Sequence, residues 1–205
     1  TIPVIERIRA KSDVPLSIDT YRLEVARAAL DAGADAINDV TAFSHDEDMA
    51  SLAASRDVSV VLMHMQGTPR TMQQNPHYDD VVAEIYRFLS RAVSRAEAAG
   101  VRRDRIAVDP GFGFGKTVQH NLEMLRRLHE FRSLGCPVLI GTSRKSTIGK
   151  VLDRPVDERL FGTAATVALA VRSGAAILRV HDVAQTRDVV RMTEAILGRT
   201  QQDQK

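Results

Sequence analysis

With 205 residues, of which 44% are hydrophobic and 26% charged, the chain has the composition of a single globular domain, residues 1–205, and not of a fibrous or disordered protein. The 28 Lys and Arg against 26 Asp and Glu leave a formal charge of only +2, and the basic residues are scattered, so we expect no nucleic-acid or membrane partner. The single cysteine, Cys136, cannot form an internal disulfide, which predicts a cytoplasmic location.

The first ten residues have a helical pattern, with Thr1 as a cap and Pro3 in the first turn. In an alternating α/β fold, a helix this early should follow a strand. We therefore expect that the domain is N-terminally truncated in this chain.

Short β-branched runs then recur along the chain. Because both faces of most runs are apolar, they indicate buried parallel strands. Between them, apolar residues recur at intervals of three and four, which predicts helices. The longest of these helices begins near Asp79 or Asp80 and ends at Gly100. The expected strands are residues 14–18, 36–40, 58–63, 105–108, 137–140 and 175–180.

Two α/β architectures fit this alternation. One is an open doubly wound sheet of six strands, and the other is a (β/α)8 TIM barrel from which strands 1 and 2 are absent. The pattern alone slightly favours the open sheet. The position of the polar residues favours a barrel.

Polar residues stand at or near the carboxyl ends of all six expected strands. Any one of them alone is more commonly a helix cap or a turn former, but the carboxyl ends of parallel strands are where α/β proteins place their sites. Six together therefore indicate a binding site. They are Asp19, Asn38 with Asp39, His64, Asp109, residues 143–145 and residues 179–182.

Three of these residues, Asp19, Asn38 and Asp109, are short donors or acceptors suited to an amide-and-amine edge such as that of a pterin. Asp39 should point to the opposite face from Asn38, so we assign it to a turn or cap. Two interpretations of His64 are equally compatible with the sequence. It lines an apolar wall of the site together with the neighbouring methionines, or it has a structural role.

The glycine-rich run at residues 109–117 invites a nucleotide-binding interpretation. However, Pro110 stands where a P-loop needs glycine, and a dinucleotide motif needs its third glycine one residue after Gly115. We interpret the run as a loop that carries two aromatic faces, Phe112 and Phe114, beside a carboxylate. Either ring could equally fill the core.

Lys145, Arg179 and His181 place cations at the same strand ends. Arg179 and His181 alternate along an expected strand, which suits an anion such as pyrophosphate. The alternative is that they form ion pairs with Asp182 and Asp188. No pair of His or Cys has metal-ligand spacing, and no Gly-x-Ser-x-Gly elbow is present, so we expect neither a metal site in this chain nor a nucleophilic triad.

These motifs, in this order, resemble dihydropteroate synthase along essentially the whole chain. The resemblance implies a pterin-binding (β/α)8 barrel. It also implies a transferase of folate biosynthesis that joins 6-hydroxymethyl-7,8-dihydropterin diphosphate to p-aminobenzoate, giving dihydropteroate and pyrophosphate. The segments that carry it are residues 17–21, 37–40, 62–69, 109–116, 143–146 and 179–182.

By this resemblance Asp19, Asn38 and Asp109 hold the pterin ring, Met63 packs on it and Lys145 reaches its edge. Loss of the diphosphate leaves positive charge on the pterin methylene, which Asp19 and Asp109 would stabilise. The catalytic residues would be Asp19, Asp109 and Lys145. Because the aniline nitrogen of p-aminobenzoate is already nucleophilic, no strong base is required.

The same resemblance assigns the diphosphate to Arg179, Val180 and His181. Ser143 and Phe114 would border p-aminobenzoate, the site at which sulfonamides compete. The family also uses Mg2+, whose protein ligand we expect in the missing N-terminal segment. A homodimer is expected too, with support from the apolar residues 164–171.

Two other functions compete with this interpretation. A methyltetrahydrofolate-corrinoid methyltransferase would share the pterin-facing acids but should lack the 143–146 motif and the Arg179 and His181 pair. A catalytically inactive pterin-binding fragment is the second. Activity with pterin diphosphate and p-aminobenzoate distinguishes all three.

Overall fold

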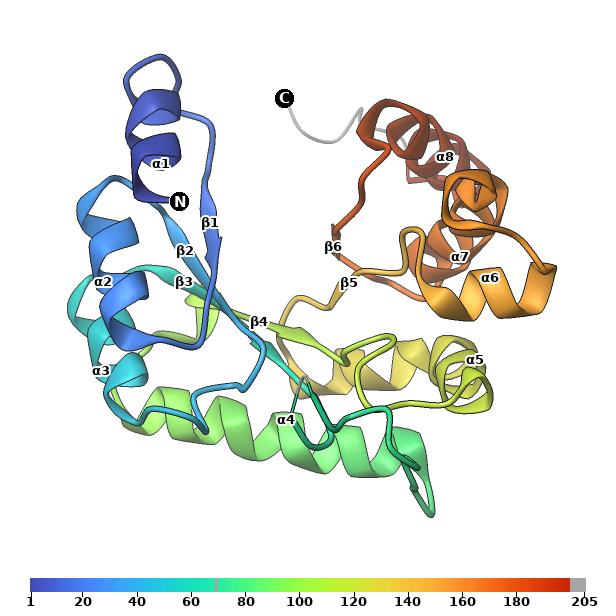
Figure 1. Ribbon diagram of the computed structural model, residues 1–205, viewed down its shortest axis with the longest axis horizontal. Coiled ribbons are helices and arrows are strands. Elements are labelled where there is room, and N and C mark those ends of the chain that lie inside the picture. Colours follow the sequence, from blue (N-terminus) through green and yellow to red (C-terminus); the bar gives the residue numbers. More distant parts are fainter. Residues whose placement is uncertain (69, 200–205) are drawn as a thin grey trace. The chain divides into compact units, whose positions relative to one another are not determined.

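The computed structural model describes residues 1–68 and 70–199, in which helices alternate with short parallel strands (Figure 1). The chain forms two compact units. The first contains residues 1–65 and 85–110, and the second contains residues 66–84 and the chain from residue 111 onward. No helix in the described ranges is both long and apolar enough to cross a membrane.

The first unit contains a four-stranded parallel sheet in the order β1-β2-β3-β4. Figure 1 shows α2 and α3 side by side next to this sheet. The strands are β1 (Ser17–Asp19), β2 (Ala36–Asp39), β3 (Ser59–Met63) and β4 (Ile106–Asp109). The helices are α1 (Ile2–Arg9), α2 (Leu23–Asp31), α3 (Asp48–Ser55), the 3-10 turn η1 (Arg103–Arg105) and most of α4 (Val81–Ala98).

Three strands of the first unit, β2, β3 and β4, are buried on both faces. Ile37, Val60 and Leu62 are completely buried, and every residue of β4 is buried. Burying a side chain of this size contributes roughly 1.5–3 kcal/mol. On α4, Ile85 and Leu89 are also completely buried. The predicted buried parallel strands are confirmed at β2, β3 and β4, as is the apolar face of the long helix. The prediction was wrong for β1, in which only Ile18 is buried, and for the expected strand 175–180, in which Ile177 is 40% exposed.

The first helix is confirmed over Ile2–Arg9, but Thr1 makes no side-chain cap hydrogen bond. Arg9 attaches this helix to the segment between α2 and β2. Its guanidinium donates to the Gly33 carbonyl at 2.7 Å and to Asp35 at 2.5 Å. Asp35 also accepts the backbone N–H of Leu16 at 2.7 Å, immediately before β1.

The second unit contains the two-stranded parallel sheet β5-β6. Its strands are only two residues long, whereas the sequence predicted strands over 137–140 and 175–180. Strand pairing is limited to this short ladder. Beyond it, the Arg179 N–H donates to the Ile140 carbonyl at 3.1 Å, and the next helix begins at Val183. Cys136, just before β5, is buried. The elements are α5 (Val118–Arg126), η2 (Leu128–Leu134), β5 (Leu139–Ile140), α6 (Ser146–Leu152), η3 (Val156–Glu158), α7 (Leu160–Arg172), β6 (Ile177–Leu178) and α8 (Val183–Ile196).

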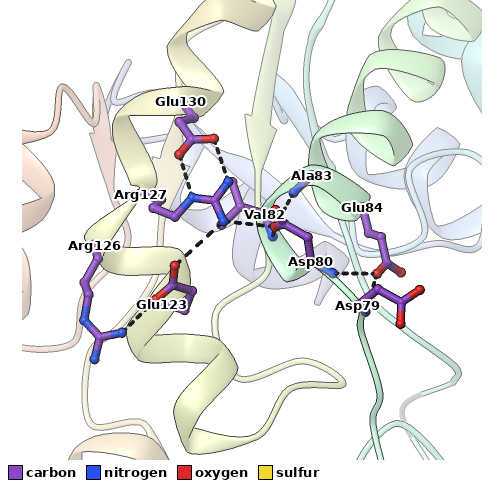
Figure 2. A network of polar contacts seen from close by, with 9 residues as sticks. All are labelled: Asp79, Asp80, Val82, Ala83, Glu84, Glu123, Arg126, Arg127 and Glu130. Atoms are coloured by element: carbon purple, nitrogen blue, oxygen red, sulfur yellow. Dashed lines mark hydrogen bonds and ion pairs between the residues drawn. The ribbon is translucent and has the colours of Figure 1, made fainter.

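A charged network stabilises the start of α4 (Figure 2). Asp80 accepts the backbone N–H groups of Val82 and Ala83, each at 3.0 Å, so the predicted start of this helix is confirmed. Arg127 donates to Asp80 at 3.0 Å and to Glu130 at 2.6 Å. The cap hydrogen bond from Ala83, followed by the Arg127 hydrogen bond, lowers the pKa of Asp80.

Candidate functional site

In the first unit, Asp19 and Asn38 form a hydrogen-bonded pair at the carboxyl ends of neighbouring strands. They are register partners, and the Asn38 side chain donates to the Asp19 carboxylate at 3.0 Å. Asp19 is exposed, whereas Asn38 is 8% exposed. Among the described residues, no donor reaches the buried Asn38 Oδ1 atom. Because an unsatisfied buried acceptor costs about 1–3 kcal/mol, this atom is suited to a ligand N–H group.

Met63 and Asp109 occupy the same end of the other two strands. They are register partners in the β3-β4 ladder, and both are buried. A thioether beside a carboxylate offers an apolar surface and an acceptor to a flat, polar-edged ring. The first unit therefore brings together Asp19 with Asn38 and Met63 with Asp109 along one edge of the sheet.

The Asp39 carboxylate accepts hydrogen bonds from the turn that follows β2, as predicted. It accepts the Thr41 N–H at 2.7 Å, the Thr41 hydroxyl at 2.8 Å and the Phe43 N–H at 3.0 Å. These bonds hold a turn in which Ala42 and Phe43 both have left-handed φ angles, of 51° and 64°. Burial raises the pKa of Asp39, against the lowering effect of these hydrogen bonds.

His64 packs in the core of the first unit. The side chain is buried, and its ring meets the Phe88 ring edge-on at 4.9 Å between centroids. Its backbone N–H donates to the Asp109 carbonyl at 2.9 Å, which extends the pairing between β3 and β4. Of the two interpretations left open, the structure favours this one.

In the second unit, Ser143 and His181 are in contact. The Ser143 hydroxyl lies 3.0 Å from His181 Nδ1 and accepts the His181 backbone N–H at 3.2 Å. Arg179 and His181 are exposed, and Val180 between them is half-buried. The prediction that they alternate along a strand was wrong, because β6 ends at Leu178.

Asp182 binds a different arginine from the one that the sequence suggested. Arg144 donates to both of its carboxylate oxygens, at 3.0 and 2.5 Å. The Arg144 hydrogen bond lowers the pKa of Asp182. The Asp182 carboxylate therefore orients the loop after β5.

Phe114 and Lys145 form the third contact of the second unit. The Lys145 ammonium lies 4.1 Å from the centroid of the Phe114 ring, within the range of a cation–π interaction. Phe114 is half-buried, whereas Phe112 is completely buried and fills the core. The two aromatic residues of the glycine-rich run thus have different roles.

Comparison with known proteins shows the family of this chain. Residues 1–181 match the family described as Pterin binding enzyme. The chain is 45% identical to dihydropteroate synthase of Haemophilus influenzae over 194 residues, covering 95% of this chain and 70% of that protein. Escherichia coli K12 dihydropteroate synthase is 44% identical, with 96% and 70% covered. The chain belongs to the dihydropteroate synthase family.

Solved dihydropteroate synthases have the same fold. The Stenotrophomonas maltophilia enzyme, with imidazole bound in its active site, superposes with a TM-score of 0.92 at 47% identity, covering 96% of this chain and 74% of that one. The Xanthomonas albilineans enzyme in complex with 7,8-dihydropteroate superposes with a TM-score of 0.89 at 45% identity, covering 96% and 72%. The fold is therefore the pterin-binding barrel and not the open sheet. Pro69, in one of the segments that carry the resemblance, lies outside the described residues.

Two buried polar residues of the dihydropteroate synthase fold were missed from the sequence. Lys116 donates to the Gly111 and Phe114 carbonyls at 3.0 and 2.9 Å. Asn121 accepts the Gly113 N–H at 2.8 Å. The available signal was an asparagine in the first turns of a helix directly after a glycine-rich loop, where such side chains bind backbone groups.

The described residues do not by themselves form a metal centre. Nowhere in residues 1–68 and 70–199 do three His, Cys, Asp or Glu side chains come together in a way that could hold an ion. These residues thus do not fit a Mg2+ site of their own.

Proposed function

We propose that this chain binds 6-hydroxymethyl-7,8-dihydropterin diphosphate and p-aminobenzoate and condenses them to dihydropteroate, the reaction of its family in folate biosynthesis. The observation that carries the proposal is the pairing of Asn38 with Asp19, which leaves a buried amide oxygen without a donor. The 2-amino and ring N–H groups of a pterin are donors of the kind that this acceptor needs.

The first unit would hold the pterin ring. Asp19, Asn38 and Asp109 present acceptors to its amide-and-amine edge, and the Met63 thioether packs on its face. When the bond between the pterin methylene and the diphosphate oxygen breaks, positive charge develops on the methylene carbon. The carboxylates of Asp19 and Asp109 favour that charge.

The second unit would hold the diphosphate. Arg179 supplies a planar guanidinium that can donate two parallel hydrogen bonds to phosphate oxygens. His181 is oriented by Ser143, and Val180 separates the two side chains. These groups stabilise the departing pyrophosphate.

The Phe114 and Lys145 contact would border p-aminobenzoate and the pterin edge. The aniline nitrogen attacks the methylene carbon and then releases a proton, so a C–N bond replaces the C–O bond. Dihydropteroate synthases of Xanthomonas albilineans and Yersinia pestis are described with 4-aminobenzoic acid and with a sulfonamide drug, respectively. Sulfonamides should accordingly compete with p-aminobenzoate here. Ser143 would border p-aminobenzoate and, because it contacts His181, would also orient a residue of the diphosphate site.

Mg2+, a homodimer and a cytoplasmic location remain parts of the proposal. The Mg2+ ion would take its protein ligand from outside the described residues. A second copy of this chain would dock on a groove of about 570 Å3 to which Leu122, Leu125 and Leu169 contribute apolar surface. Sedimentation equilibrium tests the dimer, and Leu169→Glu should shift it toward monomer.

The decisive experiment supplies pterin diphosphate and p-aminobenzoate and measures dihydropteroate and pyrophosphate. It is run on residues 1–205 alone and on the same residues preceded by the first two strands of a relative, because the chain spans about 70% of the relatives' length. Product from the extended form supports the proposal. Pterin binding without product in both forms would show an inactive pterin-binding protein. Methyl transfer from methyltetrahydrofolate would show the other alternative.

A further inference from the structure

We propose that Asn121 and Lys116 are positioning residues that hold the glycine loop, residues 111–117, in the one conformation that brings Phe114 against Lys145. The kinetic part of this inference rests on the proposed function, whereas its structural part does not. All the residues involved belong to the second unit.

Asn121 connects the glycine loop to the helix that follows Lys145. Its side-chain oxygen accepts the Gly113 N–H at 2.8 Å, while its amide nitrogen donates to the Thr117 carbonyl at 2.9 Å and to the Thr147 hydroxyl at 3.0 Å. The residue is 1% exposed. Only a side chain with both a donor and an acceptor at this length can make all three bonds. Asn121 thereby fixes the position of the loop relative to α6.

Lys116 holds the same loop from within. The residue is 3% exposed, and its ammonium donates to the carbonyls of Gly111 and Phe114, at 3.0 and 2.9 Å. A buried ammonium is costly unless it is paired with acceptors, so these carbonyls must stay turned toward it. The two bonds close residues 111–114 into a ring around a single cation.

The loop geometry leaves little room for a different arrangement. Gly113 has φ +83° and a Cβ there would lie 3.3 Å from Lys145 Cδ, so the Lys145 stem packs directly on the loop backbone. At Gly115 a Cβ would approach the Gln66 carbonyl to 2.6 Å. The buried Tyr78 hydroxyl also donates to the Gly115 carbonyl at 2.8 Å. The loop is therefore held between two neighbouring segments, and Lys116 and Asn121 decide where Phe114 lies.

A nuclear magnetic resonance measurement tests the structural part. Because the Lys145 ammonium lies over the Phe114 ring, the neighbouring methylene protons should resonate upfield of free lysine, and Phe114→Leu should abolish this shift. We expect Asn121→Leu and Lys116→Met to reduce the shift. Leu128→Ala, which removes a buried side chain elsewhere in the second unit, is the control and should retain it. An unchanged shift in both folded variants would overturn the inference.

Milder variants keep the inference testable if Asn121→Leu fails to fold. Asn121→Asp retains the acceptor for Gly113 but loses the donor to Thr147. Thr147→Val removes only the Thr147 hydroxyl, and Thr147→Ser restores it. We expect Thr147→Val to reduce the Lys145 shift and Thr147→Ser to preserve it. The same behaviour of both threonine variants would contradict a positioning role.

Synthase kinetics test the functional part. A displacement of about 1 Å at a reacting group can cost 100-fold in rate, so we expect kcat/KM for p-aminobenzoate to fall at least about tenfold in Asn121→Asp. Leu128→Ala should lose thermal stability without this loss, and an equal loss there would overturn the functional part. If neither residues 1–205 alone nor the extended form makes dihydropteroate, the proposed function fails while the resonance measurement still decides the positioning role.

Discussion

The two units place opposite chemistry at the same topological position. The strands of the first unit end in acceptors, two of which, Asn38 and Asp109, are buried. In the second unit, β6 leads into the exposed side chains of Arg179 and His181. Asn38 lies on β2, an inner strand of the four-stranded sheet, whereas β6 pairs with a single strand over only two residues.

This difference shows that the two units position their own candidate residues by different means. In the first unit, the backbone register places Asp19 opposite Asn38. In the second unit, side-chain contacts position the candidate residues, as the contact between Ser143 and His181 does. The exposure of Arg179 also avoids the desolvation cost of a buried charge. The following predictions test whether ring binding and anion binding are separable in this way.

The largest effect is expected for Arg179→Ala. Hydrogen bonds to charged groups contribute about 1.5–3 kcal/mol, so affinity for the pterin diphosphate should fall roughly 10- to 150-fold. Affinity for the hydroxymethyl pterin without phosphates should not change, because that ligand offers the guanidinium no charge. Calorimetric titration of both ligands measures this. Arg187→Ala, an exposed arginine on α8, is the matched control. Equal losses for the two ligands would mean that Arg179 is structural.

Asn38→Leu should give the complementary result in the first unit. Removing the amide leaves a pterin donor unpaired and should weaken both pterin ligands equally, by about 1–3 kcal/mol. Ile37→Val, in the same strand and also buried, should reduce stability without affecting either affinity. A loss confined to the diphosphate ligand would contradict the division between ring and anion.

Asp39→Ala should affect stability but not ligand preference. It removes the acceptor of three hydrogen bonds, and the unpaired Thr41 and Phe43 N–H groups should cost about 1–3 kcal/mol in the free energy of unfolding. Urea unfolding measures this. The pKa of Asp39 is raised, so between pH 3.8 and that raised value the folded state retains a proton that the unfolded state releases. Stability should therefore fall as pH rises through this window, and Asp39→Asn should remove that contribution.

The smallest effect concerns His120, at the start of α5. Its ring nitrogen accepts the Thr117 N–H at 3.3 Å in a capping box, which requires the neutral form. Burial, then the charges of His77 and Lys116, lowers the pKa of His120 below 6.5. The unfolded state thus binds more protons below pH 6.5, and stability should fall as pH drops through that region. His120→Gln keeps a cap acceptor and should flatten this dependence. An unchanged slope in urea unfolding between pH 5 and 7.5 would contradict it.

The sequence predicted most of the first unit because its signals are local. Apolar runs that are buried on both faces marked β2, β3 and β4, and the alternation of side chains correctly separated Asn38 from Asp39. The second unit was predicted less well. The end of β6 depends on how many residues of β5 are available for pairing. Asp182 binds Arg144, which lies 38 residues away in the sequence. Contacts of that kind are set by tertiary packing and leave no periodic signal.

The buried thiol of Cys136 offers an internal probe of how the second unit opens. It is the only cysteine in the sequence and is 6% exposed, shortly before β5. A thiol reagent can react with it only when this region opens, so the labelling rate reports the free energy of that opening. Comparing labelling with and without pyrophosphate would reveal whether anion binding closes the unit, without any need to measure turnover.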